Sequence, residues 1–379
     1  MRRPFREAVQ VKYLTDKVGV YLHFPFCAKK CAYCNFYSAV FTDVMCDAYT
    51  DALISEIKKW GGRVDRPIDT IYIGGGTPSL LGRRIGRVLS SIRQSFDMQD
   101  DAEITVEANP DSCDRDFLDR AAAAGVNRLS LGVQSGDDKM LEKLGRSHSF
   151  AQAEKAVGNA RAAGFKNVSV DLMTALPDSN AETLRNDIDA ICGLCPEHIS
   201  AYILKAEPHT VFGRGVRGIP DDDCAAEQYL FTCEELQKRG YRQYEISNFA
   251  KNGFESRHNL KYWRCEEYIG IGPSAHSFFG GERFYCPSDL KGFISAPKIV
   301  SEGAGGGKEE RLMLALRLSE GTDISLYGSV SGTLEKFLCR LKKERLIEKN
   351  GTHISLTARG MAVSNSIITE ITELLYENI

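Results

Sequence analysis

The alternation of short β-rich runs with amphipathic helical stretches constrains the fold of this chain more than any other feature. The β-rich runs fall at residues 19–24, 70–75, 103–109, 128–134, 167–173 and 198–204. Between them, residues 47–60 and 80–96 place apolar side chains at helical spacing. Gly125, Gly164 and Gly240 each follow a helical stretch and precede a β-rich run, as expected for glycines that cap helices in the left-handed conformation. Successive helix-to-strand connections are typical of parallel βαβ units, so the sequence predicts an α/β fold with a partial (β/α)6, TIM-like barrel.

The alternation stops near residue 250. An aromatic, polar segment covers residues 256–281, and SEGAGGGKEE at 301–310 has the composition of a loose connection. The remainder predicts a helix, a hairpin with an Asn350–Gly351 turn and a final helix, which together suggest a small, mostly helical, winged-helix-like domain. We therefore expect three parts: a core at 1–250, a connecting segment at 251–300 and a C-terminal domain at 301–379.

Polar residues lie at the ends of the predicted strands. Glu107, Gln134 and Asp171 each stand at or near the end of an apolar run, and IYIGGGTPS continues the second strand as a glycine-rich turn. Parallel α/β folds bind their ligands at the carboxyl ends of the strands. The sequence therefore predicts a binding site at this edge.

Three cysteines, Cys27, Cys31 and Cys34, follow the first predicted strand within eight positions. Thiolates bind iron–sulfur clusters and zinc. Three of them can hold three corners of a [4Fe–4S] cluster and leave one iron open to a small molecule. Zinc would need a fourth ligand, which Cys192 or Cys195 could supply, but both lie far along the chain at the end of a predicted helix. For these two cysteines the sequence favours a structural role.

Charge and cysteine usage limit the compartment and the partners. The formal net charge is −3, and no apolar stretch approaches the roughly 20 residues that span a bilayer, so nothing indicates nucleic-acid or membrane binding. The N-terminal residues are basic without an apolar export signal, so the twelve cysteines are expected to be reduced thiols in the cytoplasm. Monomer and homodimer both remain open.

HFPFCAKKCAYCNF and IYIGGGTPSLL resemble the signature segments of the radical S-adenosylmethionine (SAM) superfamily. The resemblance implies that the amino and carboxylate groups of SAM coordinate the open iron. It further implies an electron donor that reduces the cluster, and cleavage of SAM to methionine and a 5′-deoxyadenosyl radical.

Over most of its length the chain is similar to the coproporphyrinogen dehydrogenase group of this superfamily. The matching motifs imply SAM-binding roles for Tyr21, Tyr33, Gly75, Gly76, Thr77, Glu107, Gln134, Arg146 and Asp171. The residue types suit these roles, because glycines allow close backbone approach and an arginine can pair with a carboxylate. Acidic side chains suit ribose hydroxyls and an ammonium group.

Two features resemble the heme-chaperone (HemW) branch of this group. Phe36 stands where the dehydrogenase has a further cysteine, and His258-Asn-Leu-Lys-Tyr-Trp263 matches the HNxxYW motif of the branch. The resemblance implies binding of heme, with His258 as a ligand, and delivery of heme to apo-proteins; His276 is a second ligand or a structural histidine. The alternative is an oxygen-independent coproporphyrinogen III oxidase. Asn35 and residues 174–179 depart from the usual pattern of the branch.

Overall fold

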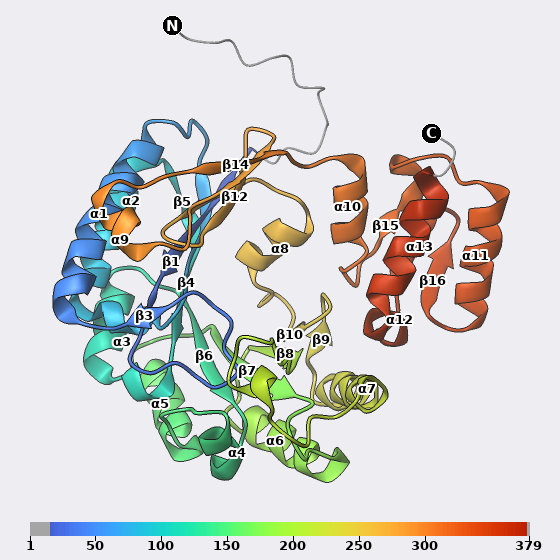
Figure 1. Ribbon diagram of the computed structural model, residues 1–379, viewed down its shortest axis with the longest axis horizontal. Coiled ribbons are helices and arrows are strands. Elements are labelled where there is room, and N and C mark those ends of the chain that lie inside the picture. Colours follow the sequence, from blue (N-terminus) through green and yellow to red (C-terminus); the bar gives the residue numbers. More distant parts are fainter. Residues whose placement is uncertain (1–15, 377–379) are drawn as a thin grey trace, which may run out of the picture.

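The computed structural model of the protein describes residues 16–376. A twelve-stranded sheet forms the larger part of the molecule, and a three-stranded sheet with its own helices lies to one side of it (Figure 1). The prediction that the chain carries no export signal rests on its N-terminal segment, and residues 1–15 of that segment lie outside the described residues. Within residues 16–376, no helix combines the length and the apolar character needed to cross a membrane.

Six parallel strands form the centre of the large sheet. They are β1 (Val18–Phe24), β4 (Ile68–Gly75), β5 (Met98–Ala108), β6 (Arg128–Gln134), β7 (Val168–Thr174) and β8 (His198–Ile203). These strands coincide with the six predicted ones, which confirms the α/β class and the partial barrel.

The helices that connect these strands are α1 (Asp43–Gly61), α2 (Ile85–Ser95), α3 (Arg115–Ala123), α4 (Asp138–Lys143), α5 (Phe150–Ala162) and α6 (Ala181–Gly193), and α7 (Asp222–Lys238) follows β8. Gly125, Gly164 and Gly240 have φ values of +88°, +95° and +86°, which confirms them as left-handed caps. The helix expected at 80–96 is divided, because Gly82 (φ +52°, ψ −124°) interrupts a 3-10 segment, η1 (Pro78–Arg84), before α2 begins. Other short 3-10 segments are η2 (Pro110–Ser112), η3 (Phe212–Arg214) and η4 (Ile324–Leu326).

The large sheet extends beyond the six predicted strands on both sides. The additional strands are β9 (Arg242–Gln243), β10 (Asn248–Ala250), β11 (Tyr268–Ile271), β12 (His276–Phe279), β13 (Glu282–Tyr285) and β14 (Val300–Ala304). The loose connection predicted at 301–310 was wrong, because β14 pairs with β13 and α10 (Lys308–Ala315) begins soon afterwards. The sheet thus continues past the boundary expected at residue 300.

The remaining elements are two short strands that follow β1 and pair with each other, and the elements of the connecting segment and the C-terminal domain. They are β2 (Phe26–Cys27), β3 (Ala39–Val40), α8 (Arg257–Trp263), α9 (Leu290–Ser295), β15 (Thr322–Asp323), α11 (Gly332–Lys343), β16 (Ile347–Asn350), β17 (His353–Leu356), α12 (Ala358–Ala362) and α13 (Ser364–Tyr376). The hairpin β16–β17 turns at Gly351 (φ +61°), so the predicted helix, hairpin and final helix are confirmed.

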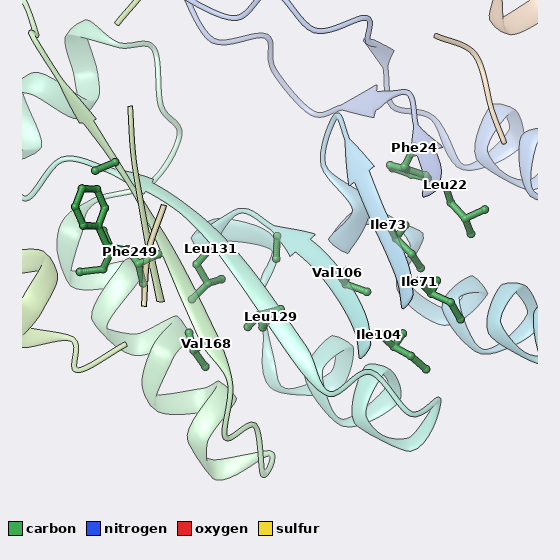
Figure 2. Close-up of a cluster of buried hydrophobic side chains, with 14 of the residues drawn as sticks. Leu22, Phe24, Ile71, Ile73, Ile104, Val106, Leu129, Leu131, Val168 and Phe249 are labelled. Atoms are coloured by element: carbon green, nitrogen blue, oxygen red, sulfur yellow. The ribbon is translucent and has the colours of Figure 1, made fainter. Parts of the chain in front are cut away.

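The two faces of the barrel strands differ in chemistry. One face is apolar and packs into a single core with the surrounding helices; Figure 2 shows part of it, including Leu22, Ile71, Ile73, Ile104, Val106, Leu129 and Leu131. Burial of each such side chain stabilises the fold by roughly 1.5–3 kcal/mol. The alternating residues enclose a polar interior with Thr70, Tyr72, Glu107, Arg128, Ser169, Asp171 and His198. Buried polar groups need partners, so this interior belongs to a site or to a network that supports one.

Candidate functional site

A pocket opens at the carboxyl ends of the parallel strands. Its empty volume is about 760 Å³, part of which is open to solvent. The predicted site residues that line it are Cys27, Cys31, Tyr33, Cys34, Gly75, Gly76, Thr77, Glu107, Gln134, Arg146 and Asp171. Tyr21 and His258 do not line it. The fold therefore brings together most of the residues that are far apart in the sequence.

The three cysteines of the pocket are free thiols on the loop that follows β1. Polar groups from other elements face two of the sulfurs: Thr77 Oγ1 lies 3.5 Å from Cys27 Sγ, and Arg146 Nη1 lies 3.4 Å from Cys31 Sγ. Burial raises the pKa of the Cys34 thiol. The Arg146 guanidinium thus places a positive charge beside one of the sulfurs, and the thiolate is the form of cysteine that binds iron.

The cysteine arrangement does not suit a single metal ion. Within residues 16–376, no three or more His, Cys, Asp or Glu side chains converge on a position that one ion could occupy. Cys192 is half-buried and Cys195 exposed, and neither lines the pocket, so no second cysteine pair joins the first. The three cysteines of the loop are therefore the cysteines that line this pocket among the described residues.

The glycine-rich turn after β4 leaves the backbone open at the pocket wall. Gly75 has a φ of +115°, and a Cβ on it would come within 2.7 Å of the His23 ring. A Cβ on Gly76 would collide with the backbone carbonyl of Phe26, and one on Gly74 would lie 3.0 Å from the Glu107 carboxylate. Only glycine fits these positions, because other parts of the protein occupy the space that a Cβ would take, and Gly75 and Gly76 also line the pocket. The sequence analysis had not singled out Gly74.

Two carboxyl groups lie deep in the pocket. Glu107 accepts hydrogen bonds from the Tyr72 hydroxyl (2.8 Å) and from the Gly75 N–H (3.0 Å), while burial raises its pKa. Burial, and then the neighbouring Glu107 charge, raise the pKa of Asp171 to about 7. Such carboxyl groups, short of favourable charge partners, can accept hydrogen bonds from ribose hydroxyls or pair with an ammonium group.

Arg146 and Gln134 also line the pocket, and Gln134 ends β6, which lies between the strands that carry Glu107 and Asp171. Arg146 Nη2 donates to Asn109 Oδ1 (2.8 Å) and to the Gly132 carbonyl, but its buried Nε has no partner among residues 16–376. Gln134 adopts a φ of +83° and accepts a hydrogen bond from the Tyr202 hydroxyl (2.8 Å). An unpaired buried donor and a strained backbone are both typical of a ligand site.

Sequence reasoning missed Asn109 and Tyr202, which also line this pocket. Asn109 could have been found, because it is the first residue after β5 and lies two positions after Glu107. Tyr202 could have been found as a polar residue near the end of β8, where the strand-end argument also applies.

Tyr21 lies below the pocket, inside the barrel. Its hydroxyl hydrogen-bonds with His23 Nδ1 (3.0 Å), and its ring lies 6.2 Å from that of Tyr72. Tyr21 therefore contacts residues that support the pocket wall, and its role toward SAM stays a prediction.

His258 lies still deeper, on α8, against the amino-terminal half of β4. Its ring nitrogens hydrogen-bond with the hydroxyls of Thr70 and Tyr262, each at 2.8 Å, and the ring stacks on Tyr72 at 5.4 Å. The residue is 0% exposed, and burial, followed by the charges of Lys261 and Arg128, lowers its pKa to about 3. A heme could reach this imidazole only if α8 left the barrel, so the ligand role of His258 stays a prediction.

His276, the other histidine of the heme prediction, lies on the surface of β12. Its Nδ1 is 3.4 Å from Glu302 Oε2, and its ring stacks on Tyr285 at 5.3 Å. The structure places it far along the sheet order from the barrel strands that carry the pocket carboxylates.

Known proteins match the chain over nearly its whole length. A radical SAM superfamily model matches residues 21–191, and a HemN C-terminal domain model matches residues 309–363. A protein named heme chaperone HemW from Lactococcus lactis is 34% identical over 92% of this chain and 96% of its own length. Its namesake from Bacillus subtilis is 35% identical over 92% of this chain and 97% of its own.

A solved structure confirms the fold. The coproporphyrinogen III oxidase HemN from Escherichia coli superposes with a TM-score of 0.80 at 22% identity, over 96% of this chain and 90% of the oxidase. At this identity the likeness concerns the fold alone. The sequence relatives decide the family: the chain belongs to the radical SAM superfamily and, within it, to the family of the HemW proteins.

Proposed function

We propose that this protein is a heme chaperone that holds a [4Fe–4S] cluster and SAM in the strand-end pocket, binds heme and delivers it to apo-proteins. One observation carries the proposal: three cysteines and a set of SAM-type contacts line one pocket in a chain whose full-length relatives are named heme chaperones. The cytoplasmic location and the electron donor for the cluster belong to the same proposal.

Each side of the pocket offers a different chemistry to these ligands. Cys27, Cys31 and Cys34 would bind three irons, and the open backbone at Gly75 and Gly76 would receive the amino-acid end of SAM. When bound, the cluster and SAM supply a one-electron route to a 5′-deoxyadenosyl radical.

The remaining pocket residues orient the ligands and balance their charges. Arg146 places a guanidinium between the thiols and the pocket wall, where it can stabilise negative charge on either side. Glu107 and Asp171 offer acceptors to hydroxyl or ammonium donors at the pocket wall.

Phe36 supports the chaperone over the oxidase. It lies at the mouth of the pocket with 67% of its surface exposed, at the position where the dehydrogenase group has a further cysteine. The pocket therefore lacks that thiol and instead presents an apolar ring to solvent.

The test is anaerobic reconstitution followed by two assays. We expect about four irons and four sulfides per chain, as the [4Fe–4S] stoichiometry requires, stoichiometric heme uptake, and no conversion of coproporphyrinogen III. Turnover of coproporphyrinogen III at enzymatic rates would contradict the proposal and support the oxidase. Chains that take up neither iron nor sulfide would contradict the cluster assignment.

A further inference from the structure

The accessibility of the histidines restricts which of them can bind heme iron. The chain contains seven histidines, all of them within residues 16–376. Four are buried and use at least one ring nitrogen in an internal hydrogen bond: His23, His148, His198 and His258. The three exposed ones are His209, His276 and His353. An axial ligand needs a ring nitrogen that a bulky porphyrin can approach, which favours the exposed set.

Among the exposed histidines, His209 lies closest to the cysteine loop. It belongs to the loop after β8, and its Nε2 contacts Asn35 Oδ1, next to Cys34. The backbone joins the same two loops, because the Phe212 N–H donates to the Ala32 carbonyl at 3.1 Å. His209 is thus held at the rim of the strand-end pocket.

The surface around His209 combines exposed apolar side chains with cations. Phe36 and Val211 are 67% and 66% exposed, so both present apolar surface to solvent. Lys30 Nζ lies 3.3 Å from the Phe36 carbonyl, and Arg214 Nη2 lies 3.5 Å from the His209 carbonyl. We call the set of Lys30, Asn35, Phe36, His209, Val211 and Arg214 the rim surface.

The composition of the rim surface matches the chemistry of heme. A porphyrin has two flat apolar faces, a central iron that accepts an imidazole nitrogen, and two propionates that pair with cations. The Glu302 carboxylate 3.4 Å from the His276 ring would repel propionates. His209 also has a carboxylate nearby, Glu207, but that group pairs with Lys205 at 2.8 Å. His353 lies on β17 of the C-terminal domain, away from the barrel strands.

We propose that heme docks on the rim surface, with His209 as axial ligand and with Lys30 and Arg214 facing the propionates. This inference rests on the proposed chaperone function and assigns its cargo a place. An exposed site also suits delivery, since no helix has to leave the barrel for heme to pass to an acceptor. A ligand at His258 would require that α8 open and that two buried hydrogen bonds break.

Hemin titration of the anaerobically reconstituted full chain tests the proposal, read as the difference spectrum against the heme-free protein. We expect His209→Ala to lose the low-spin imidazole spectrum and to weaken hemin binding by at least about tenfold, or 1.4 kcal/mol. Added imidazole should restore the low-spin bands in this variant, which a purely structural role would not explain. His353→Ala serves as the matched exposed-histidine control and should match wild type.

Charge reversals test the propionate contacts. Lys30→Glu and Arg214→Glu should each weaken hemin binding, whereas Lys336→Glu, an exposed lysine on α11, should not. An unchanged spectrum and hemin affinity in His209→Ala would overturn the inference. It would also be overturned if folded His258→Ala lost the imidazole spectrum while His209→Ala kept it. Failure of the wild-type protein to bind hemin at all would instead remove the proposed function itself.

Discussion

Substitution of His258 tests whether the HNLKYW segment closes the barrel from within. His258→Ala removes the hydrogen bonds to Thr70 and Tyr262 and the stack on Tyr72. Each buried hydroxyl left without a partner costs about 1–3 kcal/mol. Loss of a buried ring adds a cavity term, and the full truncation of an aromatic side chain costs about 3–5 kcal/mol. The Thr70 and Tyr262 hydroxyls can partly re-pair with each other or with water in the space that the ring leaves. We therefore expect a total loss of about 3–5 kcal/mol in the free energy of unfolding.

Such a loss would be a large fraction of the roughly 5–15 kcal/mol that stabilises a folded protein. The assay is urea unfolding followed by circular dichroism, with wild type, His258→Ala, Tyr262→Phe and His353→Ala compared in one buffer. Tyr262→Phe removes one of the two hydrogen bonds and should cost about 1–2 kcal/mol. The exposed His353→Ala should change stability by no more than about 0.5 kcal/mol.

The double variant gives an internal check. His258→Ala and Tyr262→Phe remove the same hydrogen bond. The double variant should therefore lose less stability than the sum of the losses in the two single variants. If His258→Ala lowered the free energy of unfolding by less than about 1 kcal/mol, like the His353→Ala control, the conclusion that His258 on α8 stabilises the barrel interior would be refuted.

Three further substitutions test other parts of the structure. Glu245 is fully buried, and burial raises its pKa from 4.5 to about 7. The folded state therefore holds the Glu245 proton more tightly than the unfolded state does. The contribution of Glu245 to stability should fall by about 3 kcal/mol in all as pH rises from about 4 to 7. Urea midpoints of Glu245→Gln should decline less than those of wild type, since Asp171 keeps its own raised pKa in both proteins, and a parallel pH profile in both would contradict the reasoning. Gly76→Ala places a methyl group against the Phe26 carbonyl and should weaken SAM binding, measured by equilibrium dialysis, by at least about tenfold. The control Gly86→Ala has open space around the new methyl group and should bind SAM as wild type does. Equal affinities in both variants would argue against a SAM site at this turn. Cys27→Ala should lose the visible absorption and most of the iron after reconstitution while Cys192→Ala keeps both, and a full cluster in Cys27→Ala would show that the ligands were misassigned.

The sequence predicted the barrel well because each of its units carries local signals. The apolar strand runs, the helical spacing and the cap glycines Gly125, Gly164 and Gly240 all act within a few residues of each other. The extension of the sheet was harder to predict. Strands β9 to β13 have two to four residues each, and β14 is fully exposed with a glycine in its five residues, so their pairing depends on neighbours far along the chain.

The candidate site shows the same division. Motif-based prediction found the cysteines and most of the pocket wall, because strand ends converge at one edge of a parallel sheet. It did not foresee that His258 is enclosed, because a polar-aromatic run of seven residues has no period that shows burial. It also passed over His209, since a single histidine in a loop becomes significant only when the fold places it beside Asn35 and the cysteine loop.

Transfer of heme is the property that most directly defines a chaperone. The measurement is incubation of the reconstituted chain, loaded with one heme, with the apo form of a heme-dependent enzyme from the same cell, followed by separation of the two proteins and assay of the acceptor. We expect the acceptor to gain heme and activity faster than it does from an equal concentration of free hemin. Heme that stays on this chain, or an acceptor that gains activity no faster than from free hemin, would contradict the account.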